Sequence, residues 1–202
     1  MSCEFAGILN GLGVQTHLWY RGEAVLRGFD TEARDVIVQG MQERGVQMHM
    51  RTNVTRIEKQ GSGYSVTDTQ GARHDFDVVM YATGRSPKSA GLGLEALGIG
   101  LDAAGAVQVD EFSQTSVPSI YAVGDVTNRV NLTPVAIREG MAFVDTALKG
   151  NPTPVDHALI PTAVFTQPEF GTIGLSEEQA RAQESIEVYA TAFRPMNISF
   201  ID

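Results

Sequence analysis

The 202-residue chain has a single cysteine, Cys3, so an internal disulfide framework is excluded. Its 4 histidines are scattered without the spacing of metal ligands, and no metal site is expected. No apolar run approaches the roughly 20 residues of a membrane-spanning helix, and no basic-then-apolar leader opens the chain, so no membrane partner is expected. The net charge of −9 argues against nucleic acid as a partner. These absences favour a cytoplasmic location.

The residues that are abundant indicate an α/β protein. A hydrophobic fraction of 43% and 21 glycines suit a packed core with many tight turns. Hydrophobic spacing predicts helices over residues 4–12, 31–44 and 134–148, with Asp30 as the N-cap of the second. Strands are predicted over residues 14–20, 46–50, 75–82, 107–110 and 120–123, with an antiparallel pair over 52–59 and 64–69.

One predicted strand ends at Gly124-Asp125, and the rest of the chain is organised around this point. A glycine lets a ligand approach the backbone closely, and the carboxylate after it can accept hydrogen bonds from hydroxyl groups. Further on, Leu132-Thr133-Pro134 opens a helix, with Thr133 as the expected N-cap and Pro134 where a missing N–H costs nothing. A carboxylate and a positive helix end should therefore meet in one crevice.

Two arginines follow the first predicted strand. Arg21 lies at its carboxyl end and Arg27 comes six residues later. In a dinucleotide-binding βαβ unit, an acidic residue at this strand end binds the 2′-hydroxyl of NAD, whereas an arginine accommodates the 2′-phosphate of NADP. Guanidinium groups match the geometry of phosphate. From the residues alone, two solvated surface arginines remain the alternative.

The motifs, in this order and spacing, resemble those of the flavoprotein disulfide reductases, the pyridine nucleotide-disulfide oxidoreductase family. The segments Tyr121–Asp125 and Leu132–Ala136 resemble the second FAD signature of that family. The resemblance implies that FAD is bound by Gly124, Asp125, Leu132 and Thr133.

The resemblance also implies an NADP site. Arg21 and Arg27 match the arginine pair that holds the 2′-phosphate, and Glu4 matches a glutamate beside the nicotinamide. Gly84, in an Ala-Thr-Gly-Arg segment, allows the backbone to approach NADP, whereas Arg85 is expected to be an ion-pair partner at a domain interface rather than a direct ligand. NADP is therefore favoured over NAD.

By this resemblance the chain is expected to be an internal piece of a longer protein. It would hold a partial Rossmann-like NADP-binding domain over residues 1–87 and the C-terminal part of an FAD-binding domain over 88–157. The start of an α+β dimerisation domain would follow over 158–202. Ser176 and Gln179 are expected to form a capping box there. Residues 193–196 fit the family, and residues 197–202 do not.

In the glutathione reductase branch of the family, NADPH reduces FAD, the flavin opens a redox-active disulfide, and the dithiol reduces glutathione disulfide. The resemblance implies FAD and NADP as cofactors, with glutathione disulfide as substrate and a homodimer for the full-length protein. No catalytic residue is identified in this chain, because Cys3 matches no redox cysteine and the histidine–glutamate pair is expected outside it.

Alternatives remain within and beyond this branch. They are dihydrolipoamide dehydrogenase, mercuric reductase, trypanothione or glutathione-amide reductase, and a truncated, catalytically inactive module. The arginine pair argues against dihydrolipoamide dehydrogenase, which uses NAD.

Overall fold

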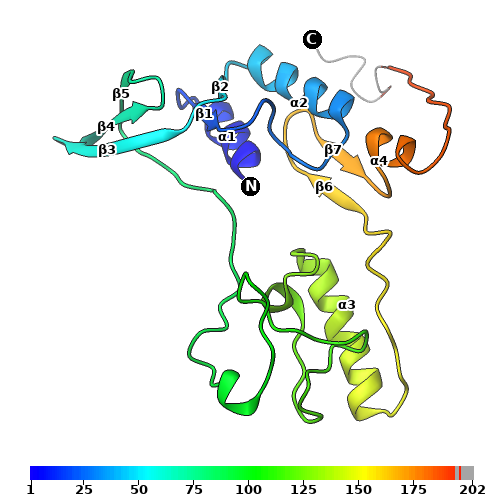
Figure 1. The fold of residues 1–202 in the computed structure, drawn as a ribbon. Coiled ribbons are helices and arrows are strands. Elements are labelled where there is room, and N and C mark those ends of the chain that lie inside the picture. The colour runs from blue at the N-terminus through cyan, green and yellow to red at the C-terminus, as the bar shows by residue number, and fades with distance from the viewer. Residues whose placement is uncertain (194–195, 197–202) are drawn as a thin grey trace. The chain divides into compact units, whose positions relative to one another are not determined.

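The computed structural model describes residues 1–193 and 196, so Arg194, Pro195 and residues 197–202, part of the expected dimerisation segment, lie outside the described residues (Figure 1). The chain forms two compact units. The α2 unit comprises Cys3–Asp77, Val164–Phe170 and the described residues from Leu175 onward. The α3 unit comprises Met1–Ser2, Val78–Ala163 and Gly171–Gly174. Within the described residues, no helix is both long and apolar enough to span a membrane.

The α2 unit begins with the predicted helix–strand–helix–strand sequence. Its elements are α1 (Ser2–Gly11), β1 (His17–Tyr20), α2 (Thr31–Glu43) and β2 (Gln47–Met50). The two strands run parallel, with His17 opposite Gln47 and Tyr20 opposite Met50. Parallel strands joined by a helix form the βαβ unit that the sequence predicts. Its core contains the side chains of Cys3, Ala6, Leu18, Val25, Ile37, Met41 and Val46.

Asp30 is the N-cap of α2, as predicted, and it also serves a second helix. Its Oδ1 accepts hydrogen bonds from the backbone N–H groups of Glu32 and Ala33, at 3.1 and 3.4 Å. Its Oδ2 accepts the N–H of Glu177, the first residue of α4 (Glu177–Arg181), at 2.9 Å. One carboxylate therefore satisfies free donors of two helices.

Glu178, on α4, makes a second contact with the start of α2. Its Oε1 accepts the backbone N–H of Thr31 at 3.3 Å. Hydrogen bonds with Thr31 first, and then with its own backbone N–H and Ser176, hold the pKa of Glu178 down to about 2. The predicted capping box of α4 is confirmed, because Ser176 and Gln179 exchange side-chain and backbone hydrogen bonds. The starts of the two helices thus cap each other.

Replacing Asp30 by alanine is expected to lower the free energy of unfolding by about 1–2 kcal/mol, since an N-cap is lost. Urea-induced unfolding would measure the change. Asp35→Ala is the matched control, because Asp35 is an exposed carboxylate on the same helix. Equal stability of the two variants would contradict the role given to Asp30.

The predicted antiparallel pair is confirmed and gains a third strand. β3 (Val54–Gln60), β4 (Gly63–Asp68) and β5 (Arg73–Phe76) form one sheet in the order β3-β4-β5. Both pairings are antiparallel. This sheet lies at the end of the βαβ unit, as Figure 1 shows for the α2 unit.

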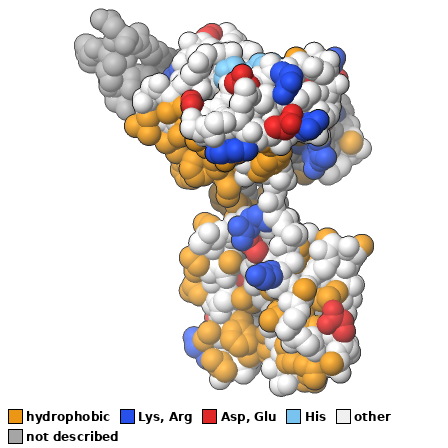
Figure 2. All heavy atoms as spheres, turned by 90° about the vertical axis from the view of Figure 1, so that its left-hand side faces the viewer, with side chains coloured by type: hydrophobic (Ala, Val, Ile, Leu, Met, Phe, Trp, Pro, Cys, Tyr) orange, Lys and Arg blue, Asp and Glu red, His pale blue; other side chains and the backbone are white. Residues whose placement is uncertain are grey.

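The predicted strand over residues 75–82 is wrong beyond Phe76. β5 ends there, and residues 77–89 contain neither strand nor helix. Val78 is 77% exposed and Tyr81 is 63% exposed. An apolar run becomes a strand only where a neighbouring strand supplies its hydrogen bonds, and among the described residues none pairs with this segment. Figure 2 shows hydrophobic side chains on the surface of both units.

Three histidines that are scattered in the sequence meet in the α2 unit. His17 on β1 and His49 on β2 place Nδ1 and Nε2 3.0 Å apart, with their rings stacked at 5.2 Å. His74 on β5 contacts the Oδ2 of Asp68 at 3.1 Å, and its ring lies 4.9 Å from that of Trp19. Parallel strands and the third strand of the sheet bring these side chains together.

This cluster should make the stability of the protein depend on pH. The pKa of His17 is lowered, mainly by burial and then by the charge of His74. The pKa of His49 is also lowered, mainly by burial and then by the charges of His17 and His74, while Asp68 acts in the opposite direction. Because the unfolded chain binds these protons more readily, the free energy of unfolding should fall as the pH drops below about 6.5. Urea midpoints measured at about pH 7.5 and 5.5 test this. His49→Gln should reduce the difference, and an unchanged difference would contradict the assignment.

The α3 unit contains less regular structure than the sequence predicts. Its helix α3 (Thr133–Phe143) continues as a π-helical turn over Val144–Leu148, so the predicted helix is present. Short 3-10 turns cover Glu95–Leu97 and Gly124–Thr127. A small core forms around Leu94, Ile99 and Val107.

Two predicted strands of this unit, over residues 107–110 and 120–123, are wrong. Each contributes only an isolated bridge, Leu101 with Val107 and Gln114 with Tyr121. The carboxylate of Asp110 accepts hydrogen bonds from the backbone N–H groups of Phe112 and Gln114, both at 2.9 Å. Such local side-chain bonds stabilise tight turns in place of an extended ladder. Two short strands that pair with each other, β6 (Thr162–Val164) and β7 (Phe170–Thr172), follow later in the chain.

Candidate cofactor-binding sites

The arginine loop, residues 21–29, joins β1 to α2 and is held in place by hydrogen bonds from α2. Arg34 on α2 donates from Nε to the carbonyl oxygen of Val25 and from Nη2 to that of Ala24, both at 2.7 Å. The Val25 side chain is buried in the core of the α2 unit. The middle of the loop therefore has a fixed path, although the loop contains no regular structure.

Arg51, just after β2, fixes the beginning of the same loop. Its backbone N–H donates to the carbonyl oxygen of Gly22 at 2.9 Å, and its guanidinium donates to Glu23 at 2.7 Å. The Glu23–Arg51 ion pair is exposed and should add little stability of its own. The backbone bond matters more, because it ties the loop to the end of the second strand.

Arg21 and Arg27 are the exposed cations of this fixed loop. Neither forms an ion pair within the part of the chain that the structure describes. Two unpaired guanidinium groups on one anchored loop suit an anion such as a phosphate, since their forked donors remain available. The structure therefore brings two of the predicted NADP residues onto one loop.

The other two predicted NADP residues lie elsewhere. Glu4, on α1 of the α2 unit, accepts the backbone N–H of Phe165 at 2.9 Å, so one of its oxygens serves the fold. Gly84 belongs to the α3 unit and has a φ of +123°, which strongly favours glycine. Gly84 and the arginine loop thus belong to different units of the chain.

The Gly-Asp turn, Gly124–Thr127, is packed closely against α3. Gly124 has a φ of +72°, and a Cβ atom at this position would lie 3.1 Å from the Cβ of Ala136. The hydroxyl of Thr127 donates to the carbonyl oxygen of Gly124 at 2.8 Å. Both the backbone conformation and the close packing therefore require glycine here.

Asp125 follows directly and turns its carboxylate outward. The side chain is 43% exposed, and its Oδ2 accepts a hydrogen bond from the Nε of Arg85 at 2.8 Å. Arg85 is thus an ion-pair partner of Asp125, but both residues belong to the α3 unit, so the structure does not show the pair as the expected domain-interface contact. An exposed pair of this kind is weak, so Asp125 remains available as an acceptor for a ligand hydroxyl.

The N-cap of α3 is Leu132, and the prediction that Thr133 caps the helix is wrong. The carbonyl oxygen of Leu132 accepts the first helical bonds, from the N–H groups of Val135 and Ala136, both at 3.0 Å. Thr133 is therefore already inside the helix. Within the part of the chain that the structure describes, no side chain caps this helix end, so its positive dipole and the backbone N–H of Thr133 suit an electron-rich ligand atom.

Glu139 is a site residue that the sequence analysis missed. Its side chain is 1% exposed, and its Oε2 accepts the backbone N–H of Gly124 at 2.6 Å. Its Oε1 contacts His157 Nε2 at 2.7 Å and Arg129 Nη2 at 2.9 Å. The sequence held a signal, because Glu139 falls four residues after Val135 and three before Ala142, on the buried stripe of α3.

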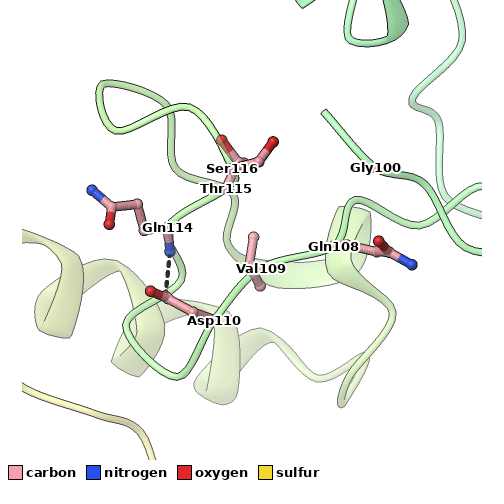
Figure 3. A pocket seen from close by; sticks show the side chains of 7 residues that line it. All are labelled: Gly100, Gln108, Val109, Asp110, Gln114, Thr115 and Ser116. Atoms are coloured by element: carbon pink, nitrogen blue, oxygen red, sulfur yellow. Dashed lines mark hydrogen bonds between the residues drawn. The ribbon is translucent and has the colours of Figure 1, made fainter. Parts of the chain in front are cut away.

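A shallow pocket of ≈ 390 Å³ also lies in the α3 unit, and none of its residues was predicted to bind a cofactor (Figure 3). Its lining is Gly100, Gln108, Val109, Asp110, Gln114, Thr115 and Ser116. The Oδ1 of Asp110 accepts a hydrogen bond from the backbone N–H of Gln114 in its own turn, as the dashed line in Figure 3 shows. One oxygen of Asp110 is therefore engaged by the fold and not directed to a ligand.

Two protein-family models match the chain. The model described as pyridine nucleotide-disulphide oxidoreductase matches residues 1–140. The model of the dimerisation domain of the same proteins matches residues 160–202. Together they account for nearly the whole sequence.

Three similar proteins are each longer than this chain. The chain is 51% identical over 197 residues to a glutathione reductase of Burkholderia cepacia, covering 97% of the chain and 44% of the relative. It is 48% identical to the chloroplastic/mitochondrial glutathione reductase of Pisum sativum, covering 97% of the chain and 36% of the relative. It is 44% identical to a trypanothione reductase of Trypanosoma congolense, covering 98% of the chain and 42% of the relative.

Solved structures give the same picture of the fold. LpdA from Mycobacterium tuberculosis superposes with a TM-score of 0.82 at 30% identity, covering 89% of this chain and 39% of that one. The flavoprotein disulfide reductase RclA from Escherichia coli, as a Cu(II) complex, gives a TM-score of 0.84 at 27% identity, covering 90% and 42%. The chain thus spans less than half the length of each of these proteins.

Proposed function

The chain belongs to the pyridine nucleotide-disulphide oxidoreductase family, and from this we propose that the full-length protein is an NADPH-dependent, FAD-containing reductase of glutathione disulfide. The observation that carries the proposal is the arginine loop, which presents Arg21 and Arg27 without ion-pair partners among the described residues. The similarity to glutathione reductases from a bacterium and a plant supports the choice of substrate.

The arginine loop would bind the 2′-phosphate of NADP. Its path is fixed by Arg34, so the loop backbone needs little ordering when the phosphate arrives, and the main cost is to order the two arginine side chains. Glu4, on α1 of the same unit, would lie near the nicotinamide, as the family resemblance implies. An acidic side chain at the position of Arg21 would instead have favoured NAD.

The Gly-Asp turn and the start of α3 would bind FAD. Asp125 offers an exposed carboxylate to a hydroxyl group, and the helix end at Leu132 and Thr133 offers its positive dipole and the N–H of Thr133 to the edge of the ring. Gly124 is buried and packs closely on Ala136, so it would serve the site by shaping the turn that presents Asp125. When bound, FAD supplies the redox chemistry, relaying two electrons from NADPH to a disulfide.

We assign no catalytic residue to this chain. Cys3 is 3% exposed in the core of the α2 unit, where it packs as a small apolar side chain. The redox-active cysteines and the acid–base pair are proposed to lie in other parts of the full-length protein. We further propose a cytoplasmic homodimer, supported by the match of residues 160–202 to a dimerisation domain.

Oxidation of NADPH by the full-length gene product, with glutathione disulfide as acceptor, tests the function. Trypanothione disulfide and lipoamide serve as competing acceptors, and NADH serves as the competing donor. Clear preference for NADPH and glutathione disulfide is expected. Turnover of trypanothione disulfide in its place would move the assignment to that substrate, which the relative from Trypanosoma congolense makes the second candidate.

A further inference from the structure

We propose that Glu139 is a positioning residue for the FAD site: it fixes the Gly-Asp turn so that Asp125 is presented to the flavin. The inference rests on the proposed function, because it takes Asp125 as a flavin ligand. Glu139 itself is 1% exposed and lies behind the turn, on the buried side of α3. It would therefore act on FAD only through the backbone that it holds.

The two oxygens of Glu139 have separate tasks. Oε2 accepts the backbone N–H of Gly124 at 2.6 Å, while Oε1 receives Arg129 at 2.9 Å and His157 at 2.7 Å. A carboxylate buried this deeply is tolerated only when it is paired and hydrogen-bonded. Arg129 and His157 pair with one oxygen of the carboxylate, and the other oxygen holds the N–H of the turn.

The peptide groups on both sides of Gly124 are fixed by this arrangement. Its N–H is held by Glu139, and its carbonyl oxygen is held by the hydroxyl of Thr127 at 2.8 Å. Side-to-side movement is limited as well, because the Cα of Gly124 packs against Ala136. The direction of the next residue, Asp125, is therefore set by groups that lie behind it.

Arg129 connects the network to the segment that precedes the turn. Its Nη2 donates to the hydroxyl of Ser113 at 2.8 Å as well as to Glu139. The carbonyl oxygen of Ser113 in turn accepts the N–H of Ala122, two residues before Gly124, at 3.0 Å. The segment before the turn and the turn itself are thus both held by hydrogen bonds that lead to the Arg129–Glu139 ion pair.

Two variants of the full-length gene product test the proposal in a graded way. Glu139→Gln keeps a neutral acceptor, and Glu139→Met keeps the side-chain volume without an acceptor. Hydrogen–deuterium exchange of the peptide that spans residues 120–128 is measured in the apoprotein, and the dissociation constant of FAD is measured by flavin fluorescence. The exchange rate of this peptide and the dissociation constant of FAD should rise together. The expected rise is about threefold or more for Glu139→Gln and at least about tenfold for Glu139→Met. Arg138→Gln, an exposed neighbour on the same helix, should leave both unchanged.

The two readouts separate the possible failures. If Glu139→Gln folds and shows the exchange and the FAD affinity of the native protein, the positioning role is overturned. Faster exchange with unchanged affinity also overturns it, because the turn would then be held for stability alone. If the native protein binds no FAD, the proposed function fails and the flavin part of this inference fails with it, which the native control reveals before any variant is compared.

Discussion

Replacing Arg21 and Arg27 together by alanine is expected to lower kcat/KM for NADPH by about 10²–10³-fold in the full-length protein. Each hydrogen-bonded contact to a charged phosphate contributes about 1.5–3 kcal/mol, and each 1.4 kcal/mol corresponds to about a factor of ten. The loss should appear mainly in KM, since the phosphate is remote from the reacting atoms and binds equally in the ground and transition states.

NADH provides the internal control for this double variant. It lacks the 2′-phosphate, so its kcat/KM should change little, and the preference for NADPH should largely disappear. Arg56→Ala is the matched control, because Arg56 is an exposed arginine on β3 of the same unit, paired with Glu58. A native protein that uses NADH as well as NADPH would contradict the assignment and favour a lipoamide dehydrogenase.

Replacing Asp125 by alanine is expected to weaken FAD binding by about 10–100-fold. The carboxylate is the exposed acceptor of the Gly-Asp turn, and a hydrogen bond to a charged group contributes about 1.5–3 kcal/mol. Asp125→Asn retains a neutral acceptor and should lose less. The dissociation constant of FAD, measured by flavin fluorescence in the reconstituted full-length protein, gives the comparison.

Arg85→Ala distinguishes a direct role of Asp125 from an indirect one. It removes the ion pair at 2.8 Å but leaves the carboxylate, so FAD affinity should stay within about threefold of the native value. A loss as large as that of Asp125→Ala would mean that the pair, rather than the acceptor, matters. Glu111→Gln, at an exposed carboxylate of the same unit, should have no effect.

The sequence predicts best the elements whose stability is local. The cap at Asp30, the capping box of α4 and the parallel βαβ unit follow from turn chemistry and hydrophobic spacing, and all are present. The α/β fold class and the family are likewise confirmed. Local rules suffice here because each of these features is completed by residues close in the chain or by one packed face.

The strands over 75–82, 107–110 and 120–123 failed for the opposite reason. A strand depends on a distant partner, and composition does not reveal whether the partner is there. Val78 and Tyr81 are apolar enough for a buried strand, yet they lie exposed in an irregular segment. In the α3 unit, Asp110 diverted the backbone into a turn instead.

The candidate sites were only partly accessible to sequence reasoning. Gly124 and Asp125 stand out because a glycine before a carboxylate is a recognisable motif. Glu139 does not, since its importance comes from the donors Arg129 and His157, which only the fold brings to it. The roles of the predicted FAD and NADP residues, and the domain limits at residues 87 and 157, stay predictions.

The α2 unit has a consequence for the order of events during synthesis, because it is built from chain segments on both sides of residues 78–163. When the ribosome has added residue 77, two contacts of this unit are still missing. The Oδ2 of Asp30 lacks the N–H of Glu177, and the ring of Phe29 lacks that of Phe170, because neither residue has been made. At roughly 5–20 residues per second, that wait is on the order of ten seconds. The nascent unit therefore persists without these contacts while residues 78–163 are made.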